Sequence, residues 1–112
     1  MKKIEAVIRP SKLEDLYNKL RQEGYSGITV TEVRGYGTQK GHKEKYRGSE
    51  HNLEFVNKVK VELVCSDNKV EKAIRIIIDQ NKTGKVGDGK IFVFTIENAI
   101  RIRTEESGES IV

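Results

Sequence analysis

The chain has 112 residues, which allows one domain with one modest hydrophobic core. Its mean hydropathy of -0.59 and its short apolar runs exclude a transmembrane helix, which needs roughly 20 apolar residues. The single cysteine, Cys65, excludes an internal disulfide and a cysteine-based zinc site. The net charge of +4 suits an anionic partner, but it fits an ordinary charged surface equally well. Glu5, close to the start, argues against a signal peptide, so we expect a cytoplasmic protein.

The first segment has a period of two, with its apolar residues at Ile4, Ala6 and Ile8. This alternation predicts a strand over residues 3–8. A helix is predicted over residues 11–23, because leucines recur at helical spacing and Gly24 offers a stop. Ser11 and Glu14 have the spacing of a capping box, in which each side chain accepts a hydrogen bond from the other residue's backbone amide.

Two more strand patterns enclose a long polar stretch. β-Branched residues predict a strand over residues 27–34, and alternating apolar and charged residues predict another over 58–65. Between them, from residue 35 to about residue 56, the chain has no clean period and is rich in glycine and polar residues. A loop of this length in a small domain is uncommon and usually functional.

The rest of the chain begins with an apolar helical stripe, for which Ser66 and Asp67 are candidate caps. The predicted segments are a helix over 67–80, a glycine-rich connection over 83–90, a strand over 91–96, an extended piece over 100–103 and a loose acidic tail over 105–110.

The predicted order is strand, helix, strand, long loop, strand, helix, strand. This order is typical of the α+β ferredoxin-like βαββαβ sandwich, in which both helices cover one face of an antiparallel sheet. We therefore expect a single domain over residues 1–112. The other face of the sheet would stay uncovered, with apolar residues such as Val7 and Val64, and would favour self-association.

The glycine-rich connection is the most informative segment for function. Gly84, Gly89 and Lys90 nearly match a P-loop, but Ile91 replaces the Ser or Thr and a strand follows instead of a helix. The backbone amides of such a turn can still form an anion-binding nest, to which Lys85 adds a cation. A plain connection before the strand explains the spacing equally well.

Arg101 and Arg103 lie two residues apart on the predicted extended piece, so both guanidinium groups would face the same side. Paired guanidinium groups suit phosphate oxygens, although charges on an edge strand also prevent aggregation. Together with the glycine-rich connection, this pair favours phosphate binding.

Residues for catalysis are sparse. His42 and His51 both lie in the long loop, without the short spacing of metal ligands. Cys65 alternates inward with its apolar neighbours, so we expect it to be buried and inert. Two other functions stay open from the residues alone. One is a small phosphate-transfer or ATP-hydrolysing enzyme using the glycine segment, and the other is a nucleic-acid-binding module, favoured by an isoelectric point near 9.2.

Over nearly its whole length, the sequence resembles the PII family of nitrogen-regulatory signal-transduction proteins. The matching segments are residues 1–6, 29–35, 39–42, 46–50, 58–62, 83–93 and 100–104, of which the last two are the most specific. The resemblance implies a homotrimer that is not an enzyme and binds ATP or ADP in clefts between subunits. It also implies three named loops, a T-loop at about 37–55, a B-loop at about 82–90 and a C-terminal loop at about 102–112.

The resemblance further implies a nucleotide site with a division of roles. Gly87, Gly89 and Lys90 would hold phosphates, with Arg101 and Arg103 from the neighbouring subunit. The base and ribose would be surrounded by Thr29, Gly35, Gly37, Glu62 and Val64. The set is completed by Asp88 and by Thr38, which replaces an arginine found near the phosphates in many members.

Family members often sense 2-oxoglutarate as well, bound with Mg²⁺ and ATP. The resemblance implies that Gln39 coordinates the metal and the acid, that Gly41 contacts the acid and that Lys58 pairs with its distal carboxylate. The acid would complete a coordination shell that ATP and Mg²⁺ begin, so ADP should not support its binding.

By resemblance, the partners would be an ammonium transporter, a nitrogen-metabolism enzyme or a transcription regulator, with no direct nucleic-acid contact and a membrane reached only through a transporter. His51 stands where many members carry a uridylylated tyrosine, so we do not expect that modification here. Ser49 matches a serine that is phosphorylated in some relatives, which is weak support for the same modification.

Overall fold

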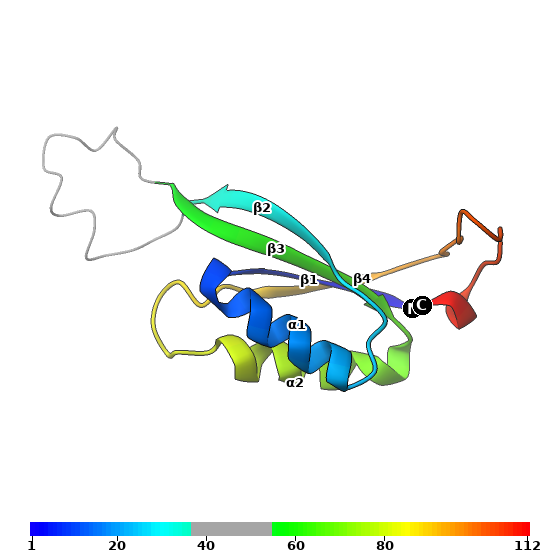
Figure 1. The fold of residues 1–112 in the computed structure, drawn as a ribbon, viewed down its shortest axis with the longest axis horizontal. Coiled ribbons are helices and arrows are strands. Elements are labelled where there is room, and N and C mark those ends of the chain that lie inside the picture. The colour runs from blue at the N-terminus through cyan, green and yellow to red at the C-terminus, as the bar shows by residue number, and fades with distance from the viewer. Residues whose placement is uncertain (37–54) are drawn as a thin grey trace, which may run out of the picture.

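The computed structural model of the protein describes residues 1–36 and 55–112. The helices and strands are β1 (Lys2–Ile8), α1 (Leu13–Gln22), β2 (Thr29–Gly35), β3 (Val56–Cys65), α2 (Val70–Asn81) and β4 (Ile91–Thr95), with short 3-10 turns at Pro10–Lys12, Asp67–Lys69 and Glu109–Ile111. The strands form one antiparallel sheet in the order β2-β3-β1-β4. Both helices cover the same face of this sheet (Figure 1). The expected ferredoxin-like α+β fold is therefore confirmed.

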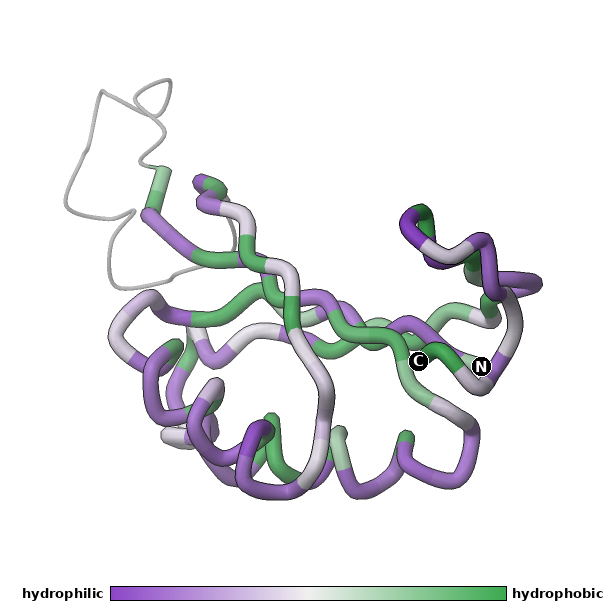
Figure 2. Tube along the Cα trace, turned by 45° about the vertical axis from the view of Figure 1, so that its right-hand side comes forward, coloured by the Kyte–Doolittle hydropathy of each residue, from purple (hydrophilic) through white to green (hydrophobic). Residues whose placement is uncertain are grey.

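The core lies between the sheet and the helices. The two central strands, β1 and β3, bury alternate residues there, because successive side chains of a strand point to opposite faces. The fully buried side chains include Ile4, Ile8, Leu16, Leu20 and Val61. Burial of one such side chain contributes about 1.5–3 kcal/mol. In Figure 2, hydrophobic residues recur along the central strands, and the helices carry long hydrophilic stretches.

Cys65 closes this core at the end of β3 and is buried, as the alternation predicts. Its burial raises the pKa of the thiol, which keeps it protonated and unreactive. No helix among the residues that the structure describes is long and apolar enough to cross a membrane.

The sheet face opposite the helices is only partly apolar. Phe92 and Phe94 are 48% and 41% exposed on β4 at its edge. Towards the middle of the sheet the face is charged, and the Lys3 ammonium lies 3.3 Å from the Glu62 carboxylate and 4.7 Å from the centre of the Phe94 ring. The uncovered apolar surface expected from the sequence is therefore concentrated at the β4 edge.

The predicted capping box is wrong. Pro10 begins a 3-10 turn that contains Ser11, so the residue before α1 is Lys12, already in a helical conformation, and no side chain caps the helix. The capping geometry needs an extended residue at this position, and the turn removes it. Helix α1 consequently begins two residues later than the sequence pattern predicts.

The extended piece predicted over residues 100–103 is also wrong. Here the chain turns back on itself, with the Arg101 amide donating to the Glu106 carbonyl and the Gly108 amide to the Ala99 carbonyl, at 2.8 and 2.9 Å. The Arg101 guanidinium also donates to the Glu106 carboxylate at 2.7 Å. This turn leaves Ile102 94% exposed, and it orders the tail that the sequence predicts to be loose.

The glycine segment and this C-terminal turn lie at opposite ends of the sheet. Ala6 pairs with Ile91 beside the glycine segment, whereas Lys2 pairs with Thr95 beside the C-terminal turn. Five residues of strand span about 17 Å at the usual rise per residue. The two chain termini lie together at the end that carries the C-terminal turn (Figure 1).

Candidate functional site

The segment between α2 and β4 folds as a closed turn around one carboxylate. Asp88 accepts hydrogen bonds from the backbone amides of Thr83 and Gly84, at 2.8 and 2.9 Å, and from the Thr83 hydroxyl. A short polar side chain that bonds nearby backbone amides is a common way to fix a tight turn. These bonds all lie within residues 83–88, so they hold the loop through its own residues.

Two cations from the sheet hold the loop from outside. The Arg9 guanidinium donates to the Asp88 carboxylate at 2.6 Å and to the Val86 carbonyl at 3.1 Å. The Lys58 ammonium, from β3, donates to the Gly87 carbonyl at 2.9 Å. The ends of β1 and β3 thus position the loop through charge-assisted hydrogen bonds, which are stronger than neutral ones.

Two groups at the loop have lowered pKa values. Hydrogen bonds from Arg9 and Thr83 hold the pKa of the Asp88 carboxyl far below its usual range. Burial, and to a smaller extent the Arg9 guanidinium, lowers the pKa of Lys58. Asp88 is therefore ionised at neutral pH, and its lone pairs are already used by the loop itself.

Gly89 passes so close to β1 that only glycine fits. A side chain at this position would overlap the backbone carbonyl of Val7, and the residue has a φ of +93°, which other L-residues rarely adopt. The loop backbone consequently lies directly against the end of β1 as it enters β4.

A cleft of about 590 Å³ opens beside this loop, on the side of the sheet away from the helices. A volume of this size is in the range of small-molecule sites. The predicted site residues that line it are Gly35, Lys58, Gly87, Asp88, Gly89 and Lys90. They come from β2, β3 and the glycine segment, so the fold brings together three regions that are distant in the sequence. Lys85 also lines the cleft, so its three lysines outnumber Asp88 and its net charge is positive.

The other predicted nucleotide residues that the structure describes lie elsewhere on the chain. Thr29 pairs with Glu62 on the open face of the sheet, and Val64 follows two residues later on the same face. Arg101 and Arg103 lie in the C-terminal turn, at the far end of β4. A single chain therefore does not place the arginine pair beside its own glycine segment.

Several predicted residues lie outside the described part of the chain. They are Gly37, Thr38, Gln39 and Gly41 of the nucleotide and 2-oxoglutarate sets, the modification positions Ser49 and His51, and His42. Nearly all of the predicted T-loop lies outside it too, and only the residues flanking this stretch, Tyr36 and Phe55, are described.

The sequence reasoning missed Arg9. This residue directly precedes Pro10 and had no partner in any local pattern, whereas the fold brings it to Asp88, 79 positions later in the chain. A lone arginine at a strand end gives no sequence signal for such a contact. Lys58 was predicted only through the resemblance, and its bond to Gly87 is likewise a product of the tertiary fold.

Comparison with known proteins gives independent information. The family described as "Nitrogen regulatory protein P-II" matches residues 1–106 of this chain. A nitrogen regulatory protein P-II from Rhodospirillum rubrum is 56% identical over 108 residues, which cover 96% of each chain. Proteins of the same name from Haemophilus influenzae and Pasteurella multocida are 54% and 53% identical over 112 residues, the full length of both chains.

The fold and the site define a ferredoxin-like domain in which a glycine turn and several lysines line one open cleft. The family match over most of the chain and the full-length relatives then give the family. The chain belongs to the P-II family of nitrogen regulatory proteins, as the sequence resemblance predicts. Its role is therefore in nitrogen-regulatory signalling.

Proposed function

We propose that this protein is a regulator that binds ATP or ADP in the cleft beside the glycine segment. The observation that carries the proposal is the convergence of Gly87, Gly89 and Lys90 with the β2 and β3 residues on one cleft of nucleotide-compatible size. Glycine-rich backbone and ammonium groups are the groups that hold phosphates in proteins. The phosphates would lie against the loop, with Asp88 contributing by holding the loop's shape.

The proposed site needs a second subunit. Arg101 and Arg103 are separated from the glycine segment by the length of β4, so their proposed contact with the phosphates requires a neighbouring copy of the chain. A homotrimer with three such clefts provides this arrangement. Thr29, Glu62 and Val64, on the open face, would then be placed to surround the base and ribose.

We further propose that 2-oxoglutarate binds together with ATP and Mg²⁺. Lys58 lines the cleft and is partly buried, which suits it to pair with a carboxylate. Gln39 would hold the metal, which would supply positive charge to the phosphates and the acid, and Gly41 would contact the acid. The occupied cleft would select among arrangements of segment 37–55 and so control an ammonium transporter, an enzyme or a transcription regulator. The cytoplasm is the compartment that this role requires.

Calorimetry tests both parts of the proposal. The protein is titrated with ATP and then with 2-oxoglutarate, with and without Mg²⁺, and the series is repeated with ADP. We expect ATP and ADP to bind, and 2-oxoglutarate to bind only when ATP and Mg²⁺ are both present. If neither nucleotide binds, the cleft is not a nucleotide site. Binding of 2-oxoglutarate that is equal with ADP would contradict the proposed requirement for ATP and Mg²⁺.

A Lys58→Met variant tests the second part of the proposal, the binding of 2-oxoglutarate. Methionine keeps most of the length of the lysine side chain and removes its charge. We expect 2-oxoglutarate binding to fall at least tenfold, in line with the loss of about 1.5–3 kcal/mol for a hydrogen bond to a charged group. Retained affinity for the acid would show that Lys58 has no part in its recognition.

The alternative function, a phosphate-transfer or ATP-hydrolysing enzyme, has less support because Asp88 is poorly suited to act as a base. This carboxylate lies at the glycine segment, but its hydrogen bonds and lowered pKa suit it to hold the loop rather than accept a proton. A measurement of phosphate release from ATP distinguishes the two functions. Turnover that is abolished by Lys90→Met would favour the enzyme.

A further inference from the structure

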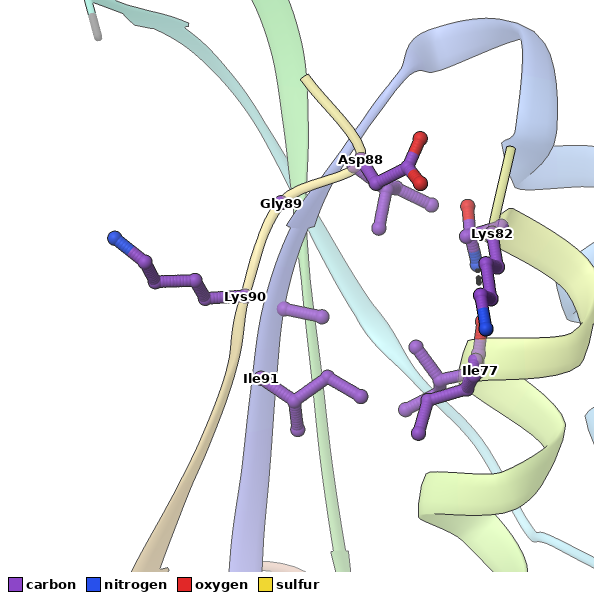
Figure 3. A pocket seen from close by; sticks show the side chains of 10 residues that line it. Ile77, Lys82, Asp88, Gly89, Lys90 and Ile91 are labelled. Atoms are coloured by element: carbon purple, nitrogen blue, oxygen red, sulfur yellow. Dashed lines mark hydrogen bonds between the residues drawn. The ribbon is translucent and has the colours of Figure 1, made fainter. Parts of the chain in front are cut away.

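The basic side chains assigned to the proposed ligands differ in what they already bind; they are Lys58, Lys90, Arg101 and Arg103. In Figure 3 the Lys90 side chain extends away from Ile77 and Ile91, and it lines the proposed nucleotide cleft. Lys58 donates to a backbone carbonyl, which is a neutral acceptor. Among the residues that the structure describes, Arg101 is the only one of the four that forms an ion pair.

The anionic partner of Arg101 is Glu106, in the same C-terminal turn. The guanidinium donates to the Glu106 carboxylate at 2.7 Å, and the two side chains are 42% and 59% exposed. Carboxylates and phosphates both accept hydrogen bonds from the planar fork of guanidinium donors. Glu106 therefore occupies Arg101 in the way that a phosphate would.

The C-terminal turn does not depend on this carboxylate for its shape. The Arg101 amide donates to the Glu106 backbone carbonyl and the Glu105 amide donates to the Arg101 carbonyl, both at 2.8 Å. The Gly108 amide donates to the Ala99 carbonyl at 2.9 Å. These bonds involve backbone atoms alone, so they persist when the Glu106 side chain is replaced. The effect of the carboxylate then falls on the Arg101 guanidinium.

We propose that Glu106 is an internal competitor for the nucleotide phosphates, which lowers nucleotide affinity by occupying Arg101 in the ligand-free protein. This inference rests on the proposed function, in which Arg101 reaches the phosphates bound to a neighbouring chain. Binding then exchanges one anionic partner of the guanidinium for another. The Glu106 carboxylate carries one negative charge and a nucleoside di- or triphosphate carries several, so a polyphosphate gains more from Arg101 than Glu106 does. Glu106 thus favours polyphosphates over ligands with a single negative charge.

Glu106→Gln tests the proposal, because glutamine keeps the shape of the side chain and removes its charge. Glu105→Gln is the matched control, since it makes the same change in net charge one residue away and leaves the ion pair of Arg101 intact. Calorimetry measures the ATP and ADP affinities of the wild type and both variants. We expect Glu106→Gln to bind both nucleotides about threefold to fivefold more tightly, the effect of one exposed ion pair. Glu105→Gln should stay within about twofold of the wild type, because solvent and salt screen its charge.

A second variant, Glu106→Ala, removes the acceptor together with the charge and should bind ATP at least as tightly as Glu106→Gln. Equal gains in Glu105→Gln and Glu106→Gln would show an effect of net charge alone and would overturn the proposal. Unchanged or weaker binding by both Glu106 variants would overturn it too, because the carboxylate would then orient Arg101 for the phosphates. A wild type that binds neither nucleotide would instead refute the proposed function, and this inference with it.

Discussion

Single residues in the glycine segment carry well-defined constraints. Gly89 lies against the Val7 carbonyl at a positive φ, whereas Gly84 has a positive φ but no atom within 4 Å of the position of a side chain. The two positions therefore separate the cost of backbone strain from the cost of overlap. The spacing of the glycines in the sequence does not distinguish them, because the overlap depends on where β1 lies.

We expect Gly89→Ala to destabilise the protein by about 3 kcal/mol or more, because the loop must move away from β1. Gly84→Ala should cost only about 1 kcal/mol, the strain of a left-handed conformation. Chemical denaturation of both variants measures these values. Equal losses of stability would mean that the approach to Val7 is not a constraint.

Asp88 links the stability of the loop to pH. Its folded-state pKa lies below that of an unfolded aspartate, about 3.9, so its stabilising contribution is complete above about pH 5 and is lost as the pH falls below about 4. The difference in melting temperature between the wild type and Asp88→Asn should therefore be largest at neutral pH and shrink in acid. A difference that stays constant down to about pH 2 would contradict the assignment.

At the scale of elements, the sequence predicts types better than ends. β1, β3 and both helices follow from the periods of their apolar residues, since each period reports the burial of one face, whereas β2 follows from its β-branched residues. The predictions of a helix cap at Ser11 and of an extended piece over 100–103 were wrong because each sequence pattern fits two structures. A serine after a strand caps a helix unless a 3-10 turn comes first, and alternating residues form a strand only if another strand is available to pair with them.

The glycine segment acts as an element because Thr83 and Asp88 close it. Thr83→Val keeps the size of the side chain and removes the hydroxyl that donates to Asp88. We expect a loss of about 1 kcal/mol of stability and about a fivefold loss of ATP affinity, both from the disorder of the loop. Thr83→Ser retains the hydroxyl and should bind ATP within about twofold of the wild type. Calorimetry measures the ATP affinity of both variants. Equal affinities would show that the hydrogen bond from the Thr83 hydroxyl to Asp88 does not affect ATP binding.

At the scale of the whole molecule, a single chain presents an incomplete version of the predicted site. Six of the predicted residues line the cleft, and the arginine pair lies at the other end of the sheet. The sequence pattern predicts the glycine segment and the arginine pair as phosphate-binding groups, but it does not report that they lie at opposite ends of the sheet. The proposed function brings the two groups together through a neighbouring copy, and periodicity and spacing do not report such a contact.

Refolding two variants together tests whether the glycine segment of one chain and the arginine pair of its neighbour form one ATP site. Lys90→Met and Arg103→Ala should each abolish or strongly weaken ATP binding when assembled alone. After unfolding and refolding together in equal amounts, about a quarter of the interfaces would combine an intact glycine segment with an intact arginine, and ATP binding should return to that level. No recovery in the mixture would mean that both residues serve a nucleotide within one chain, or that Arg103 has another role.

The position of the cleft has a consequence for the long polar segment. β2 and β3 are neighbours in the sheet. β2 ends at Gly35 and β3 begins at Val56, and both residues line the cleft together with Tyr36. Both attachment points of residues 37–54 therefore lie on the rim of one hollow. Whatever fills this hollow touches the stem of that segment on two sides, so occupancy can be communicated without any movement of the helices or the core.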